Sequence, residues 1–143
     1  MRRDEGSATV LTVGLLAVLL AVVVTVASVT HLQLQRARLA HAADEVALAA
    51  ADAIDLDAYY ADGAPAGAPL LDPARVRSEA ERHLALASAR QGLEGAVLTS
   101  ASSPDGATAE VTLALRSPLV LGAPWLPGRV DLSARASARA DVP

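Results

Sequence analysis

The chain has 143 residues, of which 52% are hydrophobic and only 2% aromatic, and its formal net charge is −4. This length leaves room for one small domain beside an anchor, and the lack of a basic excess argues against nucleic acid as a partner. Cysteine is absent, so we expect neither a disulfide nor thiolate chemistry.

The first element is an uncharged run from Ser7 to Thr30, which follows a start containing Arg2 and Arg3. A bilayer core about 30 Å thick needs about 20 apolar residues in a helix. We therefore predict a short cytoplasmic leader over residues 1–6 and a transmembrane helix over residues 7–30. A removed signal peptide is the alternative, although its apolar stretch is typically only about 7–15 residues long.

The orientation of this span follows from what comes after it. The charges on its two flanks nearly balance, but large domains translocate largely regardless of charge. We therefore expect a single-pass protein of the cell membrane, in which the residues after His31 form an extracytoplasmic domain.

The helix is expected to continue beyond the membrane over residues 31–54, because no Pro or Gly interrupts the sequence from Leu32 to Ile54 and apolar residues recur there at helical spacing. Small residues dominate this apolar stripe, and small residues let another backbone approach closely. We predict a helix-packing interface, either with the protein's own sheet or with other subunits, at Ala40, Ala43, Ala47 and Ala50.

Residues 55–72 have the Gly- and Pro-rich composition of a linker. Within them, Asp55, Asp57 and Asp62 approach the pattern of a calcium loop. Tyr59 and Tyr60 occupy its ligand and turn positions, however, and no Glu closes it. No metal site is expected there.

Residues 73–143 are predicted to form a small α+β domain. Its helix is capped by Asp72, has Pro73 at its first position and stops at Gly92. Alternating patterns then predict strands over residues 96–102, 107–116 and 129–140. The Pro-rich segment 117–128, which contains the single tryptophan, is not expected to form a regular strand. The predicted fold class is thus α+β, with a long N-terminal transmembrane helix, a second short helix and a small antiparallel three-stranded sheet.

No pattern of catalytic, cofactor-binding or metal-ligating residues emerges from the sequence. His31, His41 and His83 do not have the spacing of metal ligands, and the serines lack a nucleophile elbow. We expect no enzymatic activity, no cofactor and no small-molecule substrate.

Two short motifs accompany the apolar run: Gly6-Ser7-Ala8-Thr9-Val10 at its start and Ala42-Ala43-Asp44-Glu45-Val46-Ala47-Leu48-Ala49-Ala50-Ala51 after its end. Together with the ending over residues 130–138, they resemble the TadE/TadG-like proteins of Tad/Flp pilus assembly, especially the short actinobacterial type. The resemblance implies a pilin-like architecture, and it implies the membrane and other pilus or secretion-system subunits as partners.

The resemblance also implies prepilin-type processing between Gly6 and Ser7. In pilin-like chains a Glu follows at the fifth mature position, whereas Leu11 occupies that position here. This departure favours a minor or accessory subunit over the main filament protein. The alternative is a single-span, surface-anchored binding protein unrelated to pili, but few aromatic residues are present to line a binding pocket.

Overall fold

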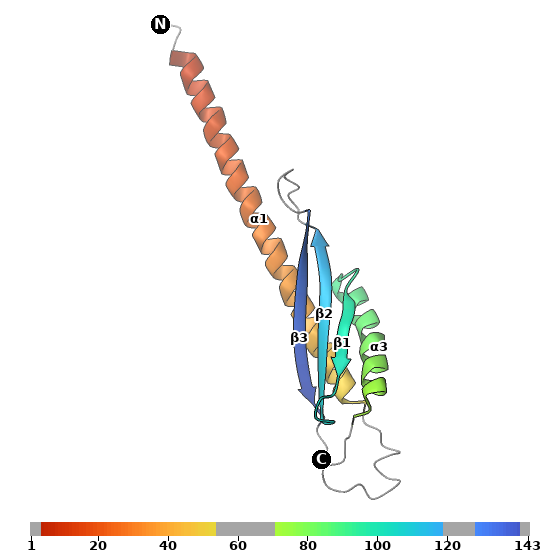
Figure 1. Cartoon of the computed structure of the whole chain (residues 1–143). Coiled ribbons are helices and arrows are strands. Elements are labelled where there is room, and N and C mark those ends of the chain that lie inside the picture. The colour runs from red at the N-terminus through yellow and green to blue at the C-terminus, as the bar shows by residue number, and fades with distance from the viewer. Residues whose placement is uncertain (1–3, 54–70, 119–127, 141–143) are drawn as a thin grey trace, which may run out of the picture.

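The computed structural model describes residues 4–53, 71–118 and 128–140. The first element is α1, an unbroken helix over Asp4–Ala51 of 48 residues, about 70 Å long at 1.5 Å per residue. Figure 1 shows its N-terminal half projecting away from the rest of the protein, while its C-terminal half lies along the sheet and the second helix. The expected end at Ile54 and the linker at 55–70 fall outside the described residues.

The second helix, α3, spans Pro73–Gln91, and its ends carry the signals expected from the sequence. Asp72 Oδ1 accepts a hydrogen bond from the Ala74 amide at 3.1 Å, which satisfies one of the amides that the first helical turn leaves open. Gly92 ends the helix with φ +64°, and its amide donates to the Ser88 carbonyl. Glycine adopts this left-handed conformation without steric cost.

Three strands follow, β1 over Val97–Ser102, β2 over Thr108–Pro118 and β3 over Arg129–Arg139. They form one antiparallel sheet in the order β1-β2-β3. Within the described residues, the expected α+β fold, with two helices and a three-stranded antiparallel sheet, is therefore confirmed.

The expectation that no strand extends into residues 117–128 was wrong for Ser117 and Pro118, which belong to β2 and pair with Val130 and Arg129 of β3. The physical reason is the short β1, whose last partner on β2 is Ala114. Beyond that residue no described strand pairs with this edge of β2, and proline is tolerated where no strand needs its missing N–H.

One core joins these elements. Leu39 and Val46 of α1, Val76 of α3, and Val111 and Leu113 of β2 are all almost fully inaccessible to solvent. They bring one face of the sheet together with both helices. No described element covers the opposite face, which has ion pairs such as Arg116–Asp131. An antiparallel sheet is stable with one face in water, because its side chains alternate between the two faces.

Candidate functional site

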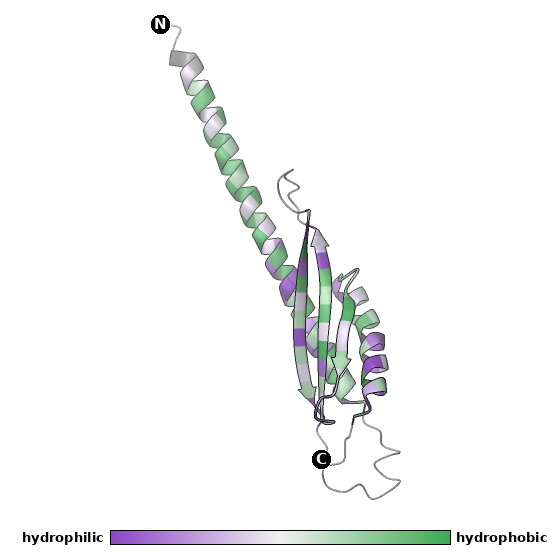
Figure 2. Ribbon diagram, in the orientation of Figure 1, coloured by the Kyte–Doolittle hydropathy of each residue, from purple (hydrophilic) through white to green (hydrophobic). Residues whose placement is uncertain are grey.

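The most distinctive surface of the protein is the N-terminal half of α1. Its large apolar side chains are exposed on every side of the helix, and Figure 2 shows this half as almost continuously hydrophobic. They comprise Val10, Leu11, Val13, Leu15, Leu16, Val18, Leu19, Leu20, Val22, Val23, Val26 and Val29. A helix that is apolar all round is buried in a large core or crosses a membrane, and here nothing in the described part of the chain covers it.

In the N-terminal half of α1, side-chain hydroxyl groups form hydrogen bonds within the helix itself. The hydroxyls of Thr12, Thr25, Ser28 and Thr30 each donate to the carbonyl four residues earlier, at 2.7–2.9 Å. In lipid, where no water is present, every such group needs a partner. The sequence showed an uncharged run, and the structure adds that its hydroxyls cost little to bury in hydrocarbon. By length and composition, α1 is able to cross a bilayer.

The four alanines expected to form a packing interface do not share one environment. Ala43, Ala47 and Ala50 are buried in the core of their own chain, whereas Ala40 is exposed. Each helical residue advances by about 100° around the axis, which places Ala40 close to the side opposite Ala42. Ala42 and Ala43 are the residues of this turn that are buried.

A second face of α1, which the sequence analysis did not identify, remains uncovered beside the domain. Leu34 and Leu48 keep 48% and 60% of their surface exposed, and Ala37, His41 and Asp44 between them are also exposed. These residues follow one another at intervals of three or four, so they line one side of the helix. We call Leu34, Ala37, His41, Asp44 and Leu48 the outer face of α1.

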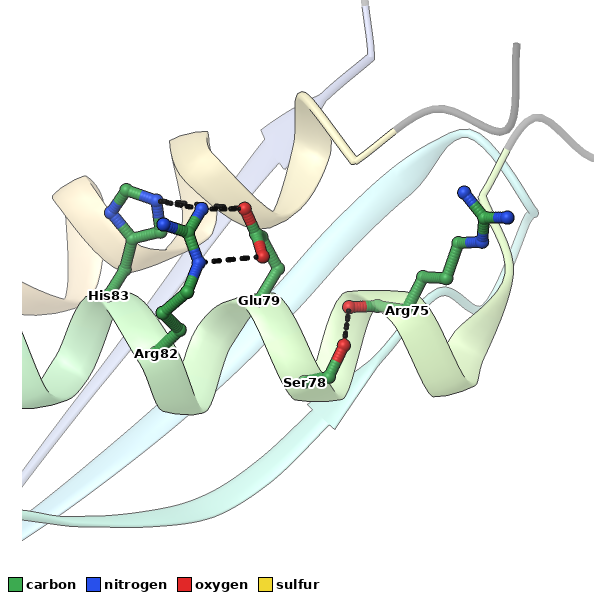
Figure 3. Close-up of polar contacts among 5 residues, drawn as sticks. All are labelled: Arg75, Ser78, Glu79, Arg82 and His83. Carbon is green, nitrogen blue, oxygen red and sulfur yellow. Dashed lines mark hydrogen bonds and ion pairs between the residues drawn. The ribbon is translucent and has the colours of Figure 1, made fainter. Parts of the chain in front are cut away.

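The polar clusters of the described residues have the character of surface pairs. Figure 3 shows Glu79 accepting from the Arg82 guanidinium, with His83 Nε2 at 3.8 Å from a Glu79 oxygen. The hydrogen bond from Arg82 lowers the pKa of Glu79, and the same bond raises the pKa of Arg82. All three side chains lie on one surface of α3, where such pairs contribute little to stability.

The histidines do not come together. His31 lies beside the end of β2, His41 lies near the Glu45–Arg90 ion pair, and His83 lies on α3. Within residues 4–53, 71–118 and 128–140, no three His, Asp or Glu side chains are arranged to hold a metal ion. The aspartates of the linker segment and Tyr59 and Tyr60 lie outside these ranges. Gly6 and Ser7 both lie inside α1, within its first turns.

Comparison with known proteins finds a family match that covers most of α1. Residues 6–53 match the family described as "Putative Flp pilus-assembly TadE/G-like". No curated protein and no solved structure matches the chain significantly. The matched segment contains both the exposed apolar half of α1 and the half that packs under the sheet. Residues 6–53 are therefore similar to the TadE/G-like family of Flp pilus assembly, and the resemblance seen in the motifs of this segment is confirmed.

Proposed function

We propose that this protein is a non-enzymatic, pilin-like minor or accessory subunit of a Tad/Flp-type pilus or a related secretion machine. The observation that supports this most directly is the single unbroken helix, exposed and apolar over one half and part of a domain core over the other. Such a helix couples a lipid-embedded segment rigidly to a small domain, which suits a part that acts by packing against other subunits.

In this proposal, residues 1–6 form a cytoplasmic leader and residues 7–30 span the membrane. Residues 31–54 extend the helix, residues 55–72 link it onward, and residues 73–143 complete an extracytoplasmic α+β domain. Contacts with other subunits use the exposed half of α1 and its outer face, because the opposite face is already occupied by the protein's own core.

The assembly role is tested by site-specific crosslinking in cells. The chain has no native cysteine, so a photo-reactive or thiol-reactive group at Ala37→Cys on the outer face is unique. Crosslinks to pilus or secretion subunits are expected from Ala37→Cys, and a matched label at Ser100→Cys on β1 serves as the exposed control. If Ala37→Cys and Ser100→Cys both yield no crosslinked subunit while the protein is present in the membrane, the assembly role is wrong.

Topology is tested by placing a reporter enzyme that is active only outside the cytoplasm after Pro143. The proposal expects activity from this fusion, and activity from a cytoplasmic reporter at the same position would reverse it. Mass spectrometry of the mature N-terminus then tests the processing site, since a chain that begins at Ser7 indicates cleavage after Gly6.

A further inference from the structure

The folded domain contacts α1 within about one turn of the residue at which the apolar run ends. The uncharged run ends at Thr30, and His31 and Gln35 on the next turn of α1 line the same recess as Leu115–Pro118 of β2. Four helical residues rise about 6 Å, which is comparable to the headgroup layer of roughly 5–8 Å on each side of a bilayer core. If the run lies in lipid, the end of β2 is therefore at headgroup level.

The pairing of β2 with β3 places the start of β3 at the same headgroup level as the end of β2. Pro118 at the end of β2 pairs with Arg129 at the start of β3, and the opposite end of the same ladder joins Thr108 to Arg139. Figure 1 shows the end of β2 and the start of β3 pointing along α1 toward its N-terminal half. We call Arg116, Pro118, Gly128 and Arg129 the proximal edge of the domain. The connecting residues 119–127 lie outside the described part, and their sequence carries no charge.

Three arginines follow at this end of the domain, two on α1 just after Gln35 and one at the start of β3, and Glu94 lines the same recess as His31 and Gln35. Arg36, Arg38 and Arg129 are exposed, and none of them has an ion-pair partner within the part of the chain that the structure describes. Side chains on a helix tilt toward its N-terminus, so Arg36 and Arg38 lean toward the apolar run. A guanidinium suits a phosphate because it presents a planar set of donors that fits two oxygens at once.

We infer that the domain lies flush on the bilayer, with its proximal edge at the lipid headgroups and with Arg36, Arg38 and Arg129 paired to the phosphates of anionic lipids. This inference rests on the membrane placement of α1 in the proposed function, and it holds for either orientation. It leaves the outer face of α1 and the distal end of the sheet open to protein partners, while the lipid covers the proximal edge.

The test measures how close two labelled single-cysteine positions lie to the bilayer, one directly before β3 and one on β3. Gly128 directly precedes β3 and is exposed, and a new side chain there meets open space. Ser137 is exposed on β3 itself, about 30 Å further along at roughly 3.3 Å per residue. The full-length protein with one fluorophore is reconstituted in phosphatidylcholine vesicles containing phosphatidylglycerol and a headgroup-linked quencher. We expect strong quenching at Gly128→Cys and little at Ser137→Cys. Equal quenching at the two sites in inserted protein would overturn the inference.

The charge contribution is tested with matched double variants. Arg36→Gln with Arg38→Gln should reduce quenching at Gly128→Cys in vesicles with phosphatidylglycerol, and raised salt should reduce it similarly. The control, Arg77→Gln with Arg139→Gln, removes two exposed cations away from the proximal edge and should leave quenching unchanged. An equal loss in both double variants would contradict specific pairing at this edge.

Vesicle flotation separates the two proposals. Protein that fails to float with the vesicles contradicts the membrane placement of α1 and thereby the proposed function as well. Protein that floats but shows equal quenching at both labels contradicts only the flush arrangement of the domain.

Discussion

Asp105 fixes the turn between β1 and β2 with three hydrogen bonds. Its Oδ1 accepts from the amides of Ala107 and Thr108 at 3.0 and 2.6 Å, and its Oδ2 accepts from the Thr108 hydroxyl at 2.8 Å. These donors favour the carboxylate and lower the pKa of Asp105. A lowered pKa in the folded state stabilises the fold above the ordinary Asp pKa of about 3.9, and this contribution is lost as pH falls through the folded value.

The variant Asp105→Ala should therefore lower the Tm at neutral pH, and its difference from the wild type should shrink once the pH falls below about 4. Thermal unfolding followed by circular dichroism between pH 3 and pH 7 measures both effects. Asp105→Asn is the control, because it keeps an acceptor oxygen but not the titrating group. A difference between wild type and Asp105→Ala that is constant over this range would contradict the role of the carboxylate.

Ala43 and Ala40 provide a matched pair on α1, since the former is buried and the latter exposed. Ala43→Leu adds volume where α1 meets the core and should cost about 1–3 kcal/mol through overpacking. Ala40→Leu should leave the free energy of unfolding nearly unchanged. Denaturant unfolding in detergent compares the two variants. Comparable losses in both would show that Ala40 is also covered.

At the scale of elements, α3 ends where Gly92 adopts φ +64°. A Cβ built there meets no atom within 4 Å, so a substitution is penalised by backbone conformation alone. Gly92→Ala should cost about 1–2 kcal/mol, whereas Gly92→Asn should cost less because Asn tolerates the left-handed region better. Equilibrium unfolding of both variants measures this order, and the reverse order would exclude backbone strain as the cause.

The continuity of α1 is the second feature at this scale. Ala40→Pro removes the helical hydrogen bond to the Arg36 carbonyl and clashes with the preceding turn, which costs about 3 kcal/mol or more. Because the Ala40 side chain is exposed, the loss arises from the backbone and not from packing. We expect reduced abundance in cells and weaker coupling of the two halves of α1, with Ala40→Gly as a milder control. Wild-type stability of Ala40→Pro would indicate that the helix is already broken near this residue.

At the scale of the whole molecule, the two halves of α1 have separate roles. Every fully buried apolar residue in the described part lies at or after Leu39, and Leu32 packs at the edge of that core. A chain that begins at His31 should therefore be soluble without detergent and unfold cooperatively, whereas the full-length chain should require detergent or lipid. Sedimentation and thermal unfolding check this, and aggregation of the shortened chain would indicate that the N-terminal half supports the fold.

Local signals in the sequence were sufficient for most of the individual elements and for the resemblance to a family over residues 6–53. Asp72, Pro73 and Gly92 marked the ends of α3 because capping depends on neighbouring residues. The alternation along β2 and β3 marked which residues face the core. The uncharged run and its flanking motifs indicated a membrane-spanning helix of the TadE/G-like type, and the match over residues 6–53 agrees with that.

Only the tertiary structure decided what covers each face. Helical spacing places alanines on a common stripe, but it does not say where a sheet lies, so Ala40 and Ala43 differ in burial although both were expected in one interface. Likewise, the placement of His31 beside Pro118 depends on how α1 packs against β2, although the two residues are more than 80 positions apart in the sequence. Local periodicity encodes the elements, whereas long-range packing determines which of their surfaces remain free to meet lipid or another subunit.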